Sequence, residues 1–321
     1  MRTAFSSGVA IAMSMACAGV SAEPAYPSRP IRIIVPFTAG STSDITARAV
    51  AARIGPPLGQ PVIVENRPGA NGVLGMQATA RSIPDGYTLV LSSASSTMVP
   101  PALLKAPPFD PRKHFTPISL VAATPLLLVT RKDASINSIS DLIAQAKRAP
   151  GTVTYGSSAG LYQLAMESLN QQAGTDIAPI PYKGPAEAET DLVGGRITVA
   201  PDSVGPILPH IRSGRIKPLA MLSAKRSDAL PDTPTMQELG YKDFDFTGWL
   251  GLLAPAGTPP EIVRRLNVEI VKAVESGEVR HQFSLLGIEA KSSTPEAYTS
   301  LIARDTARYV RIAELARIEK Q

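Results

Sequence analysis

Two segments of the chain have the composition of an anion-binding turn between a strand and a helix. The first is residues 31–44, where the apolar stretch IRIIV runs into the small-residue turn PFTAG and then into STSD. The second is residues 153–160, VTYGSSAG. The first N–H groups of a helix have no partner within the helix and carry a partial positive charge, so each turn can hold an anion. Two facing turns of this kind predict a protein that closes two lobes on a small carboxylate.

The second segment also contains the pattern G-x-S-x-G, which is typical of the nucleophile elbow of serine hydrolases. It stands between a predicted strand and a predicted helix, and Ser158 would be the nucleophile. Asp202 with His210 or His281 would complete the order Ser, Asp, His. No His-Gly-Gly-type oxyanion segment is present, and a small-residue turn that holds an anion has the same composition. An exported serine hydrolase that uses Ser158 is the alternative function.

Two aspartates near these turns have both a structural and a functional interpretation. Residues 41–44 match a capping box, in which Asp44 accepts a hydrogen bond from an otherwise unpaired N–H. We expect Asp44 to fix the loop while free N–H groups and hydroxyls face the cleft, with water as a bridge. Asp202 follows a predicted strand at 197–200 and is either a turn former or an acceptor in the cleft. Trp249 is expected in the core rather than against a ligand.

The sequence contains no pattern typical of a metal, cofactor or nucleic-acid site. No His or Cys residues stand at ligand spacing. Gly69, Gly72 and Gly75 match neither a Walker loop nor a dinucleotide-binding fingerprint. The net charge of +5 is scattered, whereas nucleic-acid binding needs a concentrated basic stripe. We therefore expect no cofactor, no metal and no nucleic-acid partner.

The N-terminal residues have the pattern of an export signal. Arg2 precedes an apolar stretch at residues 4–20, and Val20-Ser21-Ala22 is a small-x-small cleavage pattern, so residues 1–22 are predicted to be a cleaved signal peptide. The only cysteine, Cys17, lies in this segment, and Ser14 stands where a lipoprotein signal would have a Leu-like residue. The mature chain would then have no cysteine, which fits a bacterial periplasm.

The elements that position these residues form two blocks of alternating strands and helices. A length of 321 residues suggests about two domains, and alternation favours parallel sheets covered on both faces. The first block has strands predicted at 31–37, 62–65, 88–92 and 118–121, with helices from 42 and 71. The second has strands at 126–130, 153–155, 180–182, 197–200 and 217–222, with helices from 138, 160, 185 and 204. A strand at 249–254 and helices capped by Thr258 and Thr294 follow, so we expect two α/β lobes.

Ordered motifs extend over essentially the whole mature chain. They are YPSRPI and IVPF at 26–37, LGQPV and VENRPGA at 58–70, PDGYTL at 84–89, PYKG at 181–184, SAKRS and LPDTPT at 223–235, and APAGTPPEI at 254–262. Through these motifs the chain resembles the Bug family of extracytoplasmic solute receptors, the binding-protein components of tripartite tricarboxylate transporters.

The resemblance implies a two-lobed α/β periplasmic binding protein of the Venus-flytrap type, type II-like, with two crossing strands as a hinge. Those strands would be 126–130 and 249–253, with lobe 1 formed by 23–125 plus 247–321 and lobe 2 by 126–246. The ligand would be a small organic anion, a mono- or dicarboxylate, held by main-chain N–H groups, hydroxyls and bridging waters. The partners would be the membrane components of a tripartite transporter or a sensor kinase, and we expect a monomer.

The resemblance also implies the ligand-binding residues by position. They are Phe37, Thr38, Ala39, Gly40, Ser41, Asp44, Ser92, Ser93, Tyr155, Ser157, Ser158 and Asp202. Three places depart from the family pattern: Gly40-Ser41 replaces Gly-Gly, residues 159–162 form a shortened stretch that introduces Tyr162, and Pro201-Asp202-Ser203 replaces Phe-Asp-Asn. We expect Tyr162 to narrow the pocket in lobe 2, which predicts a ligand with an apolar or aromatic body.

Overall fold

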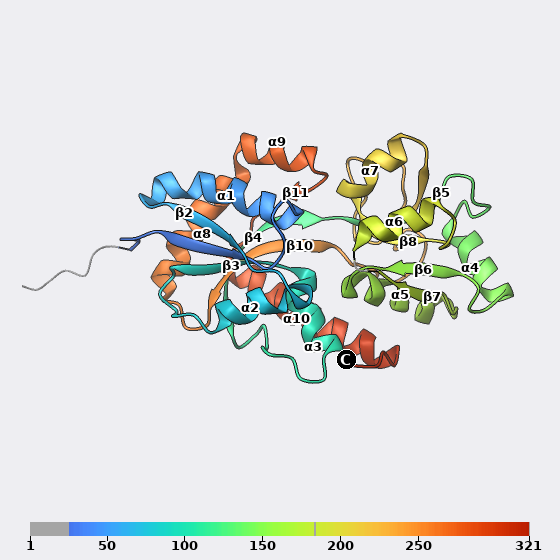
Figure 1. The fold of residues 1–321 in the computed structure, drawn as a ribbon, viewed down its shortest axis with the longest axis horizontal. Coiled ribbons are helices and arrows are strands. Elements are labelled where there is room, and N and C mark those ends of the chain that lie inside the picture. Colours follow the sequence, from blue (N-terminus) through green and yellow to red (C-terminus); the bar gives the residue numbers. More distant parts are fainter. Residues whose placement is uncertain (1–25, 183, 321) are drawn as a thin grey trace, which may run out of the picture.

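The computed structural model describes residues 26–182 and 184–320, and it consists of two α/β lobes side by side (Figure 1). The predicted signal peptide lies outside the described residues. The lobe that contains β1, which we call lobe 1, is built on a six-stranded sheet in the order β11-β4-β10-β3-β1-β2. Its strands are β1 (Ile31–Val35), β2 (Val62–Asn66), β3 (Thr88–Ser93), β4 (Phe115–Thr124), β10 (Gly248–Pro255) and β11 (Glu289–Ala290). β1 pairs in parallel with β2 and β3, whereas β10 runs antiparallel to β3 and β4.

Helices cover both faces of this sheet because its inner strands are apolar on both sides. In β1, Ile33 and Val35 pack with α1 (Thr42–Leu58), α8 (Pro260–Glu275) and α9 (Gly277–Leu285). Ile34 points to the opposite face, where it joins the core of α2 (Val73–Ala80), α3 (Ala94–Leu103) and α10 (Pro295–Leu315). A short 3-10 helix, η1 (Ala70–Gly72), precedes α2. Alternate side chains of one strand thus supply two separate cores.

Lobe 2 contains two smaller sheets. β5 (Leu126–Arg131) lies between β8 (Ala200–Ser203) and β9 (Ile216–Met221), antiparallel to both. β6 (Thr154–Ser157) pairs in parallel with β7 (Ala178–Pro181), and Tyr155 also bridges to Val199. The helices are α4 (Ile139–Arg148), α5 (Gly160–Ala173), α6 (Pro185–Val193) and α7 (Val204–Arg212). The prediction of parallel sheets is therefore correct only for β1–β3 and β6–β7. The strands β4, β5, β8, β9, β10 and β11 run antiparallel to their neighbours.

Two short connections join the lobes. β4 ends at Thr124 in one sheet and β5 begins at Leu126 in another, with Pro125 between them. The chain returns through Phe246 and Thr247 into β10. Residues 126–130 and 249–253 were expected to cross from one lobe to the other. Each of these segments instead follows a connection and lies within the sheet of one lobe.

Several helix ends differ from the expectation. Ser138 and Thr294 cap α4 and α10 as predicted, by accepting bonds from Asp141 N and Ala297 N. Thr258 does not cap α8, because its hydroxyl donates to the Pro255 carbonyl at 2.8 Å. The helices α3 and α9 were not expected from the sequence. In α3, the pair Pro100-Pro101 interrupts the helical signal, although both prolines lie inside the helix.

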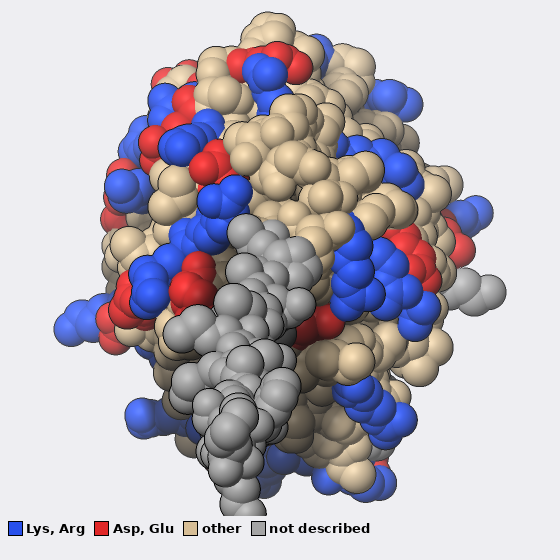
Figure 2. Space-filling model, turned by 90° about the vertical axis from the view of Figure 1, so that its left-hand side faces the viewer, with Lys and Arg blue, Asp and Glu red and all other residues tan. Residues whose placement is uncertain are grey.

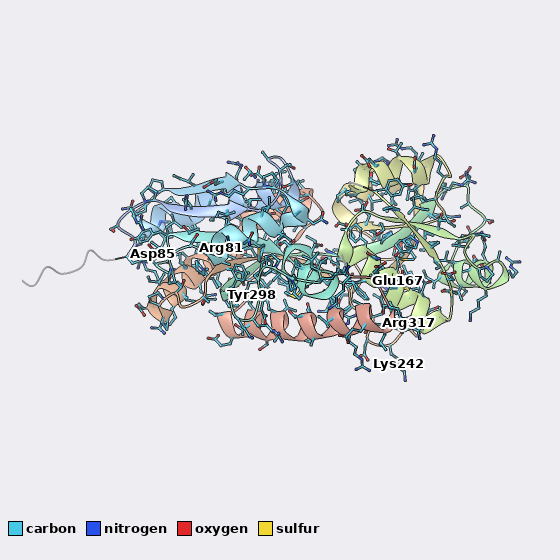
Figure 3. All side chains as sticks on the ribbon, turned by 60° about the horizontal axis from the view of Figure 1, so that its bottom comes forward. Arg81, Asp85, Glu167, Lys242, Tyr298 and Arg317 are labelled. Atoms are coloured by element: carbon cyan, nitrogen blue, oxygen red, sulfur yellow. The ribbon has the colours of Figure 1, made fainter. Side chains whose placement is uncertain are left out.

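The last helix, α10, contacts both lobes. Near its start Tyr298 packs edge-on against Trp249, with ring centroids 5.3 Å apart, which places Trp249 in the core as expected. Farther along, Tyr309 stacks on Phe246 with centroids 5.8 Å apart. In Figure 3 the helix runs from Tyr298 beneath lobe 1 to Arg317 beneath lobe 2. One continuous core cluster therefore includes residues of both lobes.

Within the described residues, no helix combines the length and hydropathy needed to span a membrane. Figure 2 views the end of lobe 1, where Lys and Arg are interspersed with Asp and Glu among uncharged residues.

The packing of Gly251 against Tyr298 yields a testable prediction. A methyl group on Gly251 would lie 2.5 Å from the Tyr298 hydroxyl oxygen, so we expect Gly251→Ala to lower the free energy of unfolding by about 1–3 kcal/mol. Tyr298→Phe removes only a hydroxyl that lies 3.0 Å from Ser92 Oγ, and should cost about 1 kcal/mol. Urea unfolding of both variants measures the two losses, and a smaller loss in Gly251→Ala than in Tyr298→Phe would contradict the packing argument.

Candidate functional site

A cavity of about 260 Å³ lies between the two lobes. Lobe 1 contributes one wall from η1, α2 and α3, and lobe 2 contributes the other from the ends of β6 and β7 and the start of α5. The lobe 1 residues are Ala70, Asn71, Val73, Ser95, Val99, Pro100, Leu103 and Leu104. The lobe 2 residues are Ser157, Ser158, Ala159, Gly160, Gln163, Pro181 and Tyr182.

The wall from lobe 2 contains an uncapped helix end and an unpaired hydroxyl. The residue at the N-cap of α5 is Ala159, whose methyl group cannot accept a hydrogen bond, and no side chain caps this helix. Beside it, the buried Oγ of Ser158 has no hydrogen-bond partner among the described residues. Leaving such a group unsatisfied costs about 1–3 kcal/mol. An oxygen of a ligand or of water in the cavity would satisfy both the hydroxyl and the helix N–H groups.

The loop before α1 is held from within by Asp44. Its carboxylate accepts bonds from Gly40 N at 2.9 Å, Asn66 Nδ2 at 2.9 Å and Arg48 Nε at 3.1 Å. Together these contacts, the hydrogen bond from Arg48 above all, lower the pKa of Asp44 to about 2. Ser41 Oγ accepts the Asp44 N–H at 3.3 Å. Asp44 thus fixes the loop, and part of the donor capacity at this helix end is already used.

The other predicted residues of this loop do not line the cavity. Thr38, Ala39 and Gly40 are exposed, and the ring of Phe37 packs beside Gly72, immediately before α2. The next residues, Thr42 and Ser43, border a separate space of about 150 Å³ that faces Ser203 and Gly205 at the start of α7. The two turns expected to face each other therefore border different spaces between the lobes.

Ser92, Ser93 and Tyr155 are engaged inside their own lobes. Ser92 is fully buried and its Oγ donates to the Gly251 carbonyl at 3.0 Å. The Ser93 side chain caps α3 by accepting from Ser96 N at 3.1 Å. Tyr155 is also fully buried, and its hydroxyl lies 3.2 Å from Glu167 Oε1. The structure corrects the expectation for Ser92 and Tyr155, because both point into a core rather than into the cavity.

Asp202 is neither a turn former nor exposed in the cleft, because it lies within β8 and is buried. Its Oδ1 accepts the Ser203 N–H at 2.6 Å and lies 3.4 Å from the Tyr162 hydroxyl. Burial, and then the charge of the neighbouring Glu189 carboxyl, raise the pKa of Asp202. Glu189 Oε2 in turn lies 3.4 Å from His210 Nε2.

Tyr162 belongs to this buried group rather than to the cavity wall. Its hydroxyl also lies 3.2 Å from Ser203 Oγ, and burial raises the pKa of the phenol. The expectation that Tyr162 narrows the pocket is therefore wrong. The apolar wall comes instead from α3, which the sequence analysis missed. The available signal was the serine cap at 93–96 followed by apolar residues at helical spacing.

The catalytic triad of the alternative function is not assembled. Ser158 Oγ has no hydrogen-bond partner among the described residues, so no imidazole activates it. Asp202 contacts Tyr162 and Ser203, His210 faces Glu189, and His281 lies on α9 in the other lobe. The serine hydrolase interpretation is not supported. Among the described residues, no three His, Cys, Asp or Glu side chains are grouped to hold a metal ion.

Glycines bring the two lobes into contact on either side of the connections. A methyl group on Gly160 at the start of α5 would collide with Val99 of α3. A methyl group on Gly205 at the start of α7 would collide with the carbonyl of Leu286, which follows α9. Both contacts join lobe 2 to lobe 1, so the absence of a side chain at these positions permits the close approach.

The raised pKa of Asp202 yields a second prediction. Because the pKa of Asp202 is raised, the folded state binds more protons than the unfolded state between about pH 4 and the raised pKa, so the free energy of unfolding falls as pH rises through that window. Asp202→Asn should flatten this fall by up to about 1.4 kcal/mol per pH unit. Urea unfolding at several pH values tests this. Asp133→Asn, at an aspartate whose side chain is 77% exposed, is the control, and parallel curves for wild type and Asp202→Asn would contradict it.

Comparison with known proteins identifies the family. Residues 46–317 match the model of the tripartite tricarboxylate transporter family receptor. The chain is 40% identical to the protein BugT of Bordetella pertussis over 305 residues, which covers 94% of this chain and 93% of BugT. It is 34% identical to a UPF0065 protein of Cupriavidus necator over 321 residues, which covers 98% of this chain and 97% of that one.

Solved structures agree with this assignment. The periplasmic binding protein BugD is 34% identical, with a TM-score of 0.78 over 92% of this chain and 100% of BugD. Rpa4515 of R. palustris with adipate is 32% identical, with a TM-score of 0.81 over 92% of this chain and 99% of that chain. MatC from Rhodopseudomonas palustris with bound malate is 28% identical, with a TM-score of 0.77 over 90% of this chain and 100% of MatC. The chain belongs to the tripartite tricarboxylate transporter receptor family, the Bug-type periplasmic solute-binding proteins with a two-lobed α/β fold.

Proposed function

We propose that this receptor binds a small carboxylate in the cavity between its lobes, at the start of α5. The observation that carries the proposal is the buried Oγ of Ser158, which has no hydrogen-bond partner within residues 26–182 and 184–320, beside the uncapped end of a 14-residue helix. A carboxylate accepts hydrogen bonds from a hydroxyl and from helix N–H groups, and the helix dipole favours its negative charge. The adipate and malate bound in Rpa4515 and MatC support this ligand class.

Binding would close the two lobes on the ligand about their two short connections. Lobe 1 would comprise residues 23–125 and 247–321, and lobe 2 residues 126–246. The contacts of Gly160 with Val99 and of Gly205 with Leu286 are the ones that a closed state needs. Closure excludes water from the cavity, which strengthens hydrogen bonds from neutral donors to the carboxylate.

The receptor would be exported by cleavage of residues 1–22, act in the periplasm as a monomer, and pass its ligand to the membrane components of a tripartite transporter or to a sensor kinase. It would bind its ligand without chemical change. The alignment of residues 46–317 with the transporter receptor family supports this role.

Removing the unpaired hydroxyl tests the binding site. Ser158→Ala should weaken binding of the tightest acid among adipate, malate and hexanoate by about tenfold, the value of one hydrogen bond to a charged group. Isothermal titration calorimetry on the mature protein measures the affinities. Ser140→Ala, at an exposed serine of α4 in the same lobe, is the matched control. Unchanged affinity in Ser158→Ala would contradict the assignment of this hydroxyl.

Adding a methyl group at the contact between the lobes tests closure. Gly205→Ala places a carbon against the Leu286 carbonyl, so it should hold the lobes apart and weaken ligand binding by about tenfold or more, while each lobe stays folded. Small-angle X-ray scattering with saturating ligand should give a larger radius of gyration for this variant than for wild type. Gly277→Ala, where the added methyl meets no atom within 4 Å, is the control. Identical scattering and affinity would contradict the closure contact.

A further inference from the structure

The wall of the cavity that comes from lobe 1 is largely hydrocarbon. Val99, Pro100 and Leu103 of α3 line it, together with Leu104 directly after this helix and Val73 at the start of α2. The polar side chains of this wall are Asn71 and Ser95. In lobe 2, Pro181 and the ring of Tyr182 also line it. The Tyr182 hydroxyl donates to Asp191 Oδ2 at 2.8 Å, so this phenol is already paired. A ligand in the cavity therefore meets aliphatic carbon where it lies against Val99 and Leu103, and neutral polar groups elsewhere.

The polar groups at the cavity are neutral. None of the described lining residues is Lys, Arg, Asp or Glu. The positive potential comes from the uncapped start of α5, where backbone N–H groups carry about half a unit charge. Ser158 lies beside this helix end, and Gln163 lies one turn further along α5. This arrangement can balance one carboxylate at one end of the cavity.

A second carboxylate would have no cationic partner among the described lining residues. Burying an ionised carboxylate without a partner costs several kcal/mol. Hydroxyl groups along the ligand would likewise face Val99, Pro100 and Leu103 of α3, whose side chains cannot accept or donate, and only Ser95 of this helix offers a hydroxyl at the cavity. Methylene groups would gain about 0.8 kcal/mol each when buried there. The cavity of about 260 Å³ is also smaller than the range of about 300–1,000 Å³ for drug-sized ligands, so the ligand is small.

We propose that the preferred ligand is a small monocarboxylate with an uncharged hydrocarbon body, its carboxylate at the start of α5 and its body against Val99 and Leu103 of α3. This rests on the proposed function, since it specifies which carboxylates the same cavity takes. The selectivity lies in α3 of lobe 1, whereas the anion is held by lobe 2. Tightly bound ligand therefore contacts both lobes, and its hydrocarbon body becomes part of the closure contact.

Three acids that differ in charge, length and hydroxylation test the proposal. Hexanoate and adipate have the same six-carbon chain, but adipate has a second carboxylate. Malate is shorter and hydroxylated. Isothermal titration calorimetry on the mature protein should find that hexanoate binds at least about tenfold more tightly than adipate, and that malate binds most weakly.

A substitution of α3 that conserves shape provides the second measurement. Val99→Thr replaces a methyl group by a hydroxyl of the same size, so it keeps the contact with Gly160 but makes the wall polar. It should weaken hexanoate binding about threefold to tenfold and change malate binding less than about twofold. Val268→Thr, at a valine of α8 that is 48% exposed, is the matched control and should change neither. Thermal unfolding of both variants without ligand verifies that they are folded.

The outcomes separate the two proposals. Tighter binding of adipate or malate than of hexanoate, or an equal loss of hexanoate and malate binding in Val99→Thr, overturns the monocarboxylate assignment while the receptor function stands. If none of the three acids binds to folded wild-type protein, both proposals fail. Hexanoate preference that Val99→Thr removes supports both.

Discussion

The uncapped start of α5 is the feature on which the binding site depends. Two neighbouring helices of lobe 2 have a capping side chain or a proline at their first positions, α4 with Ser138 and α6 with Pro185. Ala159 provides neither, and the neighbouring Ser158 keeps a buried hydroxyl without a partner among the described residues. A folded protein tolerates such unsatisfied groups when something outside the chain completes them. In the proposed function, the ligand would be that partner.

In the corresponding turn before α1, the protein's own side chains form the hydrogen bonds. Asp44, Asn66 and Arg48 form a closed set of hydrogen bonds that fixes the loop and uses the N–H of Gly40. A carboxylate of the protein thus occupies the place that an anionic ligand would take. The two helix starts, similar in sequence, have different roles: one gives a rigid edge to lobe 1 and the other keeps its donors free.

The sequence predicted the family and the two-lobed fold well, because ordered motifs and the alternation of strands and helices are local signals. It predicted Ser157 and Ser158 at the cavity but misplaced Ser92 and Tyr155. Adjacent residues of a strand point to opposite faces, and sequence alone does not say which face meets the other lobe. Helix α3 was missed because Pro100-Pro101 breaks the usual helical pattern. The helix α10 contacts lobe 2 where Tyr309 stacks on Phe246. These two residues are more than 60 positions apart along the chain, so no local sequence pattern predicts their contact.

The buried acids of lobe 2 affect the electrostatic potential at the start of α5. Tyr162 stands in the first turn of α5 and contacts Asp202, which is hydrogen-bonded to Glu189. Two ionised carboxylates near the start of α5 would be attracted by its helix dipole and would oppose an incoming anion. Because burial and the charge of Glu189 raise the pKa of Asp202, this acid keeps its proton to a higher pH than an exposed aspartate does. In the proposed function, the neutral donors of Ser158 and α5 would therefore act on the ligand with less competition from Asp202.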